Sequence, residues 1–243
     1  MSQMVSSSFP AIEAHRSAHP ASQSRSVVLR DDMIEAGFAI LRDHELDSLH
    51  IREIASKCGV SVGAFYKRFT NKDGFLRVLQ TVVVNEAGQK AEQCFADHRV
   101  ADLDLHQCIN NFVGFMIELF SGPSRGVIRA SYRGAGNDID TWEPMRQSSR
   151  LIREQFTQMI LPKLRSPGPG TREHVQFVYQ LVNGLLINDL LNPWHVYGPN
   201  SPRLKPELVR LIHLYLEAEQ LPSAPSQSAS NHSQTVNSGN SHD

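Results

Sequence analysis

Residues 50–72, HIREIASKCGVSVGAFYKRFTNK, contain the pattern that decides the fold. Apolar side chains recur at helical spacing up to Gly59, which interrupts the pattern, and Ser61 can then cap a second short helix. Phe65 and Phe69 are four residues apart, so one face of that second helix points toward the core. The pattern therefore predicts two short helices joined by a tight turn.

The outer face of the second short helix has the composition of a DNA-reading helix. The side chains left toward solvent are small, aromatic or basic, and they are Val62, Gly63, Ala64, Tyr66 and Lys67. A short helix of this kind can enter the major groove of DNA, as the second helix of a helix-turn-helix does. Residues 50–72 also carry five basic side chains and one acidic one, whereas the whole chain of 243 residues has a net charge of −1. Charge confined to one segment indicates a docking surface rather than general coating of nucleic acid.

The composition of the chain excludes several other classes of protein. No window approaches the roughly 18 apolar residues of a membrane span, and the first residues lack the basic-then-apolar order of a signal peptide. The three cysteines are odd in number and share no short spacing, which favours free thiols in a reducing compartment. We therefore expect a cytoplasmic protein that binds no cofactor and no metal.

The two ends of the chain differ in composition from the part between them. Residues 1–26 are rich in Ser without periodicity, and residues 222–243 are more so, and both segments are expected to be disordered. Almost every periodic stretch in between is helical, which predicts an all-α fold. It divides into a helix-turn-helix DNA-binding domain at 27–72 and a helical-bundle regulatory and dimerisation domain at 73–221. Besides the two short helices, helices are expected at 27–42, 72–97, 103–120, 125–134, 142–164, 173–191 and 204–219.

The last two predicted helices hold more apolar surface than one chain of this size covers easily. Residues 173–191 are apolar on nearly every side, and residues 204–219 have a broad apolar face. Packing against the same pair in a second subunit would bury this surface in a two-fold, four-helix interface, and an internal core helix is the alternative. The residues expected at the dimer interface are Val178, Val182, Leu185, Leu186, Leu208, Ile212 and Tyr215.

Residues 27–76 resemble the TetR family of bacterial transcriptional regulators, and the match rests on the segment from Ile51 to Leu76. The resemblance rests on Ile54-Ala55, on Gly59-Val60-Ser61, on Tyr66 with Phe69, and on Lys72 at the start of the next helix. It implies an N-terminal three-helix domain followed by a ligand-binding and dimerisation bundle. It also implies a homodimeric regulator rather than an enzyme. Repression is the habit of this family, with a palindromic double-stranded operator that is released when a small-molecule effector binds.

The resemblance also assigns roles to individual residues of the helix-turn-helix. Tyr66 and Lys72 match positions that grip phosphate, and Arg52 matches a position that contacts bases or backbone. The predicted DNA-contacting residues are His50, Arg52, Ser61, Val62, Gly63, Ala64, Tyr66, Lys67, Arg68 and Lys72.

Residues 62–64 match the family positions that face base edges. Because none of the three has a polar side chain, direct reading there is restricted to apolar contact, for example with thymine methyl groups. Hydrogen-bonded recognition then falls to Arg52 and Lys67, both suited to guanine, and DNA shape contributes the rest.

Two positions depart from the family pattern. Glu45 stands where the family usually has Gly after its first helix, so that turn must form without a permissive residue. Leu49 and His50 stand where the family favours Thr near the start of the next helix, and Ser48 is expected to cap that helix one residue early.

Family members typically bind a small molecule in a cavity enclosed by the helices after the DNA-binding domain. Aromatic and Met side chains at helical spacing are candidates for its wall, although such residues are also ordinary core. Asn111, Gln147 and Asn183 are candidates for the orienting polar groups. The predicted wall residues are Phe112, Phe115, Met116, Phe120, Tyr132, Trp142, Met145, Phe156 and Phe177.

Three alternative functions follow from other features of the sequence. Residues 122–126, GPSRG, match the nucleophile elbow of serine hydrolases, but that motif requires a strand-turn-helix bend and the flanks here are helical. The acidic and His residues between 97 and 106 lack any recognised metal-ligand spacing. A helical ligand-sensing or dimerisation module without operator binding is the remaining alternative, and salt-dependent DNA affinity separates it from a regulator.

Overall fold

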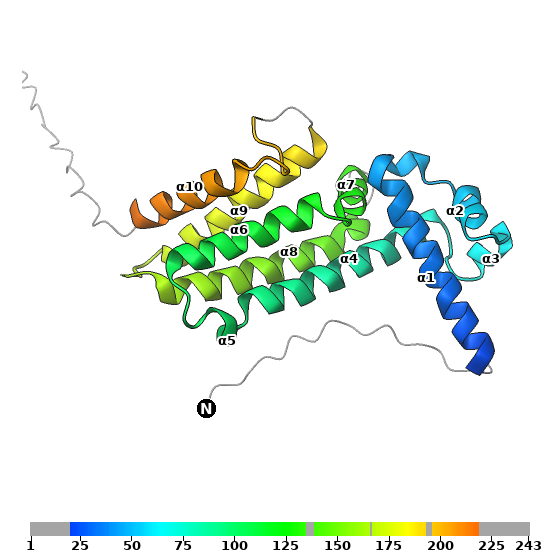
Figure 1. Ribbon diagram of the computed structural model, residues 1–243, viewed down its shortest axis with the longest axis horizontal. Coiled ribbons are helices and arrows are strands. Elements are labelled where there is room, and N and C mark those ends of the chain that lie inside the picture. The colour runs from blue at the N-terminus through cyan, green and yellow to red at the C-terminus, as the bar shows by residue number, and fades with distance from the viewer. Residues whose placement is uncertain (1–19, 135–138, 166, 193–195, 219–243) are drawn as a thin grey trace, which may run out of the picture.

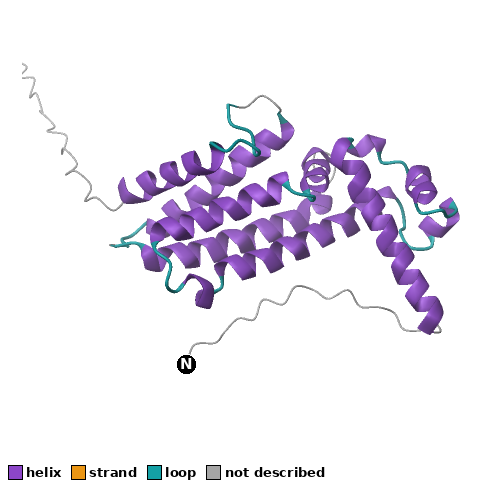
Figure 2. Ribbon diagram, viewed as in Figure 1, coloured by secondary structure: helices purple, strands orange, loops and turns teal. Residues whose placement is uncertain are grey.

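The computed structural model describes residues 20–134, 139–165, 167–192 and 196–218. All regular elements in these ranges are helical, which confirms the all-α prediction (Figure 1, Figure 2). They are α1 (Pro20–Asp43), η1 (Leu46–Ser48), α2 (Ile51–Lys57), α3 (Val62–Tyr66), α4 (Lys72–Phe95), α5 (Asp97–Val100), α6 (Leu105–Ser121), α7 (Arg125–Gly134), α8 (Ile139–Ile160), η2 (Leu161–Lys163), α9 (Thr171–Leu191) and α10 (Leu204–Ala218). Most of the two segments predicted to be disordered lies outside the described residues.

The helices lie close to their predicted positions and differ mainly at their ends. Helix α1 begins at Pro20, inside the segment that composition assigned to the N-terminal tail, and α8 begins at Ile139 rather than at 142. The cap expected from Ser48 was wrong, because Ser48 closes the short helix η1. His50 occupies the N-cap position of α2 and makes no side-chain capping bond.

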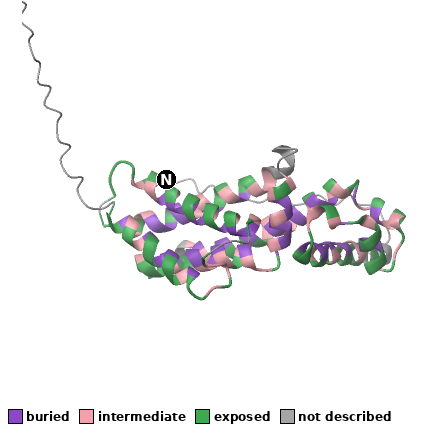
Figure 3. Cartoon of the chain, turned by 90° about the horizontal axis from the view of Figure 1, so that it is seen from above, coloured by how far each residue is buried: buried purple, intermediate pink, exposed green. Residues whose placement is uncertain are grey.

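The chain forms a small head at one end of a larger helical bundle. The head comprises α1, α2, α3 and the first turns of α4, and the bundle comprises α4 to α10 (Figure 1). Within the bundle, α4 packs along α8, and α6 packs against α10 and α9. Buried residues line the interior of both parts, whereas exposed residues cover their outer surfaces (Figure 3).

Three phenylalanines form the centre of the head. Phe65, Phe69 and Phe75 are each at most 4% exposed, and their ring centroids lie 4.7–5.2 Å apart in pairs. Such spacing suits edge-to-face contacts between aromatic rings. Gly37 of α1 allows this close packing, because a Cβ atom there would meet the Phe75 ring at 2.8 Å. The four-residue spacing of Phe65 and Phe69 thus identified the core face correctly.

Helix α4 belongs to both the head and the bundle. Its N-cap residue is Asn71, whose Oδ1 atom accepts a hydrogen bond of 2.7 Å from the Gly74 amide. Phe75 near its start lies in the head core. Phe95 at its end lies in the bundle, with its ring centroid 5.1 Å from that of Phe115. A rigid helix of 24 residues therefore connects the two cores.

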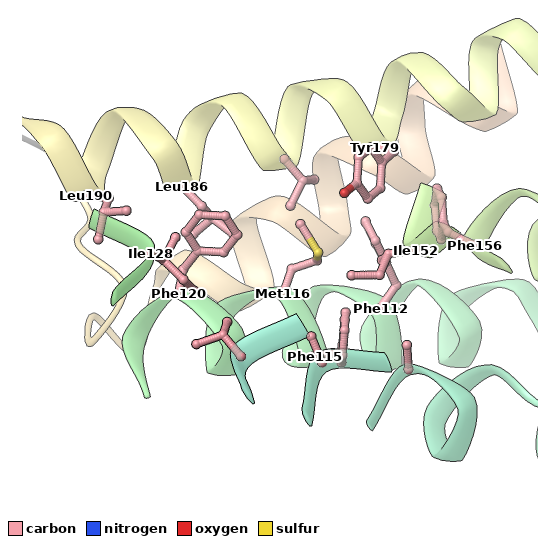
Figure 4. Close-up of a cluster of buried hydrophobic side chains, with 14 of the residues drawn as sticks. Phe112, Phe115, Met116, Phe120, Ile128, Ile152, Phe156, Tyr179, Leu186 and Leu190 are labelled. Atoms are coloured by element: carbon pink, nitrogen blue, oxygen red, sulfur yellow. The ribbon is translucent and has the colours of Figure 1, made fainter. Parts of the chain in front are cut away.

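Aromatic stacking fills the middle of the bundle. The rings of Phe112 and Phe156 stack with a centroid separation of 3.8 Å, and both side chains are fully buried (Figure 4). Met116 is equally buried beside them. These side chains already contact one another, so they form packed core.

Helix α7 makes the closest contact between the bundle and the head. Gly126 lies so near the end of α1 that a Cβ atom would stand 2.2 Å from the Leu41 carbonyl oxygen. One turn later the Arg129 guanidinium donates to the carbonyl oxygens of Leu41 and His44, at 3.1 and 3.0 Å. These bonds satisfy carbonyl groups that the end of α1 leaves without helical partners.

Glu45, which stands where the family usually has Gly, also takes part in the contact between the head and α7. Its φ of −75° is an ordinary value, so the turn after α1 needs no glycine. The carboxylate lies 3.6 Å from the Arg129 Nε atom and 3.3 Å from an Arg133 nitrogen. The side chain therefore links the head to α7.

The outward face of α9 and α10 differs from the predicted dimer interface. Val178, Val182, Leu186, Leu208 and Ile212 are at most 7% exposed in the single chain, where they pack in its own core. The partly buried Tyr215 hydroxyl lies 2.9 Å from the His174 Nδ1 atom. Only Leu185 of the predicted set is exposed. The exposed apolar side chains on these helices are Phe177, Leu181, Leu185, Leu211 and Leu214, with exposed fractions of 40–57%.

Among the described helices, none combines the length and apolar character that crossing a membrane requires.

Gly126→Ala tests the contact between α1 and α7. We expect it to lower the free energy of unfolding by about 1–3 kcal/mol, because the added methyl group would overlap the backbone of α1. Chemical denaturation of the full chain measures this change. Gly168→Ala is the matched control, because no atom lies within 4 Å of its Cβ position. Equal stability of the two variants would contradict the close approach.

Candidate nucleic-acid interface and internal cavity

The turn between α2 and α3 has the geometry that the sequence predicted. Gly59 adopts a φ of +66°, a conformation that glycine reaches without a steric penalty. The Val60 amide donates to the Ala55 carbonyl at 2.9 Å and closes the end of α2. Ser61 then caps α3 by accepting a bond of 3.3 Å from the Ala64 amide. Together these bonds fix the direction of α3 relative to α2.

The exposed surface of α2, α3 and the residue after α3 carries one phenol, and two of its cations have no ion pair among the described residues. Tyr66 is 53% exposed, and Arg52 and Lys67 are also exposed. In the described part of the chain, no ion pair is recorded for Arg52 or Lys67. Of the three small residues predicted to face bases, Gly63 is exposed, whereas Val62 and Ala64 are half-buried. The surface thus combines a shallow apolar patch with flanking positive charge.

Arg68 has a role that the sequence did not suggest. Its guanidinium donates to the Ala64 carbonyl at 2.9 Å and to the Ser26 hydroxyl at 3.2 Å. It therefore links the end of α3 to α1 by hydrogen bonds. This engagement argues against the free phosphate contact predicted for Arg68.

The other predicted contacts lie at the edges of this surface. The Lys72 ammonium is 3.5 Å from the Asp47 carbonyl oxygen, at the first turn of α4, and the residue is half-buried. His50 is exposed at the start of α2. Lys57 lies 3.9 Å from Glu53 and lines a cleft against α1, so its charge is partly compensated within the head.

A small cavity, partly open to solvent, lies among α4, α6, α7, α8 and α9. Its volume is about 30 Å³, which suits one or two water molecules. Its lining includes Phe120, Tyr132 and Met145 from the predicted wall, together with Asn183 from the predicted polar groups. The sequence therefore identified four of its lining residues.

The remaining predicted wall residues lie elsewhere. Phe112, Phe115, Met116 and Phe156 are core residues whose side chains pack on other side chains, and Phe177 is 43% exposed on the outside of α9. Trp142 lies outside the described side chains. Asn111 and Gln147 are exposed and do not line the cavity. Aromatic character alone therefore identified buried residues, without separating cavity wall from packed core.

Sequence reasoning missed three hydroxyl-bearing residues of the cavity, which are Ser148, Ser149 and Tyr179. Ser149 and Tyr179 join α8 to α9 through a hydrogen bond of 2.9 Å. The available signal was the four-residue spacing of Tyr179 and Asn183, which places two polar groups on one face of an apolar helix.

The two other motifs in the sequence have structural roles. Residues 122–126 comprise the turn from α6 to α7 and the first two residues of α7, and the Ser124 hydroxyl lies 3.5 Å from a Glu86 carboxylate oxygen. Asp104 forms a capping box with Gln107 at the start of α6. No group of three or more His, Cys, Asp or Glu side chains is arranged to hold a metal ion within the described ranges.

Comparisons with known proteins agree with this geometry. Residues 33–79 match the family model described as "Bacterial regulatory proteins, tetR family". A transcriptional regulator from Rhodococcus sp. Rha1 has 18% sequence identity and a TM-score of 0.62, over 79% of this chain and 98% of that one. The TetR family regulator PfmR from Thermus thermophilus has 13% identity and a TM-score of 0.56, over 76% and 97%.

A third similar structure is SmeT, the repressor of the Stenotrophomonas maltophilia multidrug efflux pump SmeDEF, with 19% identity and a TM-score of 0.54, over 78% and 87% of the two chains. No curated protein matches this chain in sequence. The structural similarities establish the fold, and the family match covers the helix-turn-helix with its exposed basic surface. The chain therefore has the fold of TetR-family transcriptional regulators, and residues 33–79 match the family model itself.

Proposed function

We propose that the chain is a DNA-binding transcriptional regulator of the TetR family, and that it acts as a homodimeric repressor that binds a palindromic operator and releases it when a small molecule occupies the bundle. The observation that carries the proposal is the exposed apolar row on α9 and α10, two helices that run along one side of the bundle (Figure 1). The choice of repression over activation rests on the resemblance to the TetR family, most of whose members are repressors.

The dimer is supported by the spacing of the exposed row. Phe177, Leu181 and Leu185 follow one another at four-residue intervals on α9, and Leu211 and Leu214 extend the apolar surface on α10. A contiguous apolar face of this kind indicates an interaction surface. Pairing it with the same face of a second copy would bury it in an isologous interface.

The DNA contact is proposed to use the free cations of the head. Arg52 and Lys67 would contact phosphates or guanine edges, and Tyr66 and Lys72 would contact phosphates. The small side chains at 62–64 would contact thymine methyl groups. In a two-fold dimer the two α3 helices would read half-sites about 34–36 Å apart.

Release of the operator by an effector requires a structural connection between the cavity and the head. Two helices, α4 and α7, contribute residues to both. Helix α4 contributes Val83 and Ala87 to the cavity and Phe75 to the head core. Helix α7 contributes Tyr132 to the cavity and Arg129 to the bonds with α1. A ligand that favours a different position of either helix would move the head. Switching occupancy from 1:99 to 99:1 needs about 5.5 kcal/mol of differential affinity.

The direct experiment is a selection of bound sequences from a random double-stranded pool with the purified protein. A palindromic product with steep salt dependence would support the dimeric operator-binding regulator. Failure to enrich any sequence, with a folded dimeric protein, would favour the alternative of a ligand-sensing or dimerisation module without operator binding.

Lys67→Ala tests the proposed DNA contact on the selected operator. We expect weaker binding and a plot of log affinity against log salt whose slope falls by about one, because one phosphate contact is lost. Fluorescence anisotropy at several salt concentrations measures both effects. Lys57→Ala removes the same charge from the same head, but at a site paired with Glu53, and should leave the slope unchanged. Equal effects of the two variants would contradict the assignment.

Leu181→Glu tests the proposed dimer interface. Each dimer would bring two such carboxylates into the apolar row, so we expect dissociation to monomers at micromolar concentration. Sedimentation velocity measures the oligomeric state, and circular dichroism confirms the helical content. Val28→Glu on α1 is the control, because Val28 is 57% exposed but lies in the head. A Leu181→Glu variant that stays dimeric would rule out this row as the interface.

A further inference from the structure

The internal cavity has a lining without any charged side chain. Part of the lining is aliphatic, from residues such as Val83, Ala87 and Ile152 of α4 and α8. Another part of the lining carries hydroxyl and amide groups, which come from Tyr132, Ser148, Ser149, Tyr179 and Asn183 on three helices. This is an unusual concentration of neutral polar groups in an otherwise aliphatic and aromatic core.

The polar groups of the cavity are joined in pairs across helices. The Asn183 side chain bonds the Tyr132 hydroxyl between α9 and α7, and the Ser149 and Tyr179 hydroxyls lie 2.9 Å apart between α8 and α9. Burial raises the pKa of Tyr179 to about 12 and raises the pKa of Tyr132 as well. Both phenols therefore remain neutral near pH 7, and they offer hydrogen bonds but no charge.

A charged ligand would lose its hydration in this cavity without gaining a partner charge, which is strongly unfavourable. A wholly apolar ligand would make no use of the hydrogen-bonding capacity that the hydroxyl and amide groups keep beyond these pairs. We propose that the cavity binds a small, uncharged, predominantly apolar molecule with one hydroxyl or carbonyl group, which bonds to Tyr132 and Asn183. This inference rests on the proposed function, because such a molecule would be the effector.

The cavity must enlarge to accept such a ligand, because its present volume is about 30 Å³ and pockets for drug-sized ligands are about ten times larger. Met145 of α8 is the side chain best suited to move, since it is only partly buried and an unbranched thioether adapts readily. Its displacement would open space beside Tyr132 without breaking the stacked core of Phe112 and Phe156.

The entrance is inferred at the open cleft between α8 and α9. Ser149, Tyr179 and Asn183 line both this cleft and the internal cavity, so they form the partition between the two. A groove between α4 and α6 also adjoins the cavity, but there Val83, Ala87 and Leu119 form the partition and the Lys90–Glu118 ion pair of 2.6 Å lies in the groove. A ligand with one polar group is better matched by the hydroxyl-lined partition.

The test compares three bicyclic probes of nearly equal shape, which are naphthol, naphthoate and naphthylmethylammonium. Isothermal titration calorimetry on the full chain near pH 7 measures their affinities. We expect saturable binding of neutral naphthol, with each charged probe at least ~100-fold weaker because its charge finds no partner. Comparable affinities for all three would overturn the proposal. So would a preference for naphthoate that Arg153→Gln, at the α8/α9 cleft, abolishes.

Variants locate the bound probe. Asn183→Ala and Tyr132→Phe should each weaken naphthol binding ~10-fold through the loss of a buried hydrogen bond. Asn111→Ala removes the same amide from the exposed surface of α6 and should have no effect. Thermal unfolding confirms that each variant is folded. If a variant fails to fold, Met145→Trp, which fills the cavity from its partly buried edge, should abolish binding. Naphthol binding unaffected by the folded variants would place the ligand elsewhere and overturn the proposal.

The entrance is tested by stopped-flow association of naphthol. Tyr179→Phe removes the bond to Ser149, and we expect faster association than in the unaltered chain. An unchanged rate, with acceleration instead by Lys90→Ala in the α4/α6 groove, would overturn the assigned entrance.

Operator anisotropy, measured separately, distinguishes this inference from the proposed function. Naphthol binding with these residue dependences supports the assigned ligand class even if the operator stays bound, and that result would reject effector release alone. Normal operator binding without any naphthol binding would reject the ligand class and leave the DNA-binding function intact.

Discussion

The close approach of α7 to the end of α1 is the constraint on which the arrangement of the two parts depends. It is possible only because residue 126 has no side chain, since any Cβ atom would overlap the Leu41 carbonyl. Arg129 then bonds the last carbonyl groups of α1, and Glu45 bonds the same arginine from the following turn. The missing side chain at Gly126 and the polar bonds of Arg129 thus act at one contact. The head is therefore fixed to the bundle by this contact as well as by the continuous helix α4.

Helix α7 is also tied to the rest of the bundle by buried polar side chains. The fully buried Gln80 of α4 donates to the Ser131 hydroxyl at 3.0 Å. Arg125 lies 3.5 Å from the buried Asp189 carboxylate of α9. Hydrogen bonds and ion pairs in a core are strong determinants of register, because leaving either partner unpaired is costly. Helix α7 therefore has fixed contacts with α1, α4 and α9 within ten residues.

The parts of the fold that could be predicted from the sequence are those determined by local interactions. The Ser61 cap, the tight turn at Gly59 and the four-residue spacing of Phe65 and Phe69 each involve neighbours in the chain, and all three agree with the structure. The role of Arg68 was missed because its partner Ser26 is distant in sequence. The cavity was found only in part because packed and lining aromatics have the same periodicity, and contacts between helices decide which is which.

The outward face of α9 was mispredicted for a related reason. A helix with apolar residues on nearly every side gives no periodic signal of which side faces the core, and adjacent residues differ by about 100° around the helix axis. The predicted Val182 is buried and its neighbour Leu181 is exposed, so an assignment off by one residue changes the face entirely. Only the packing of α9 against α6 and α8 settles the rotation.

The position of Tyr132 explains how a small neutral ligand could act over the length of the molecule. Tyr132 and Arg129 are three residues apart on α7, so they share one face over a single helical turn. A ligand that bonds Tyr132 and displaces Met145 would shift a helix whose next turn bonds the carbonyl groups of α1. Because the backbones of α7 and α1 are in close contact at Gly126, with no space between them, a shift of α7 would move α1. The ligand need not be large or charged, since the constraint at Gly126 converts a small displacement into movement of the head.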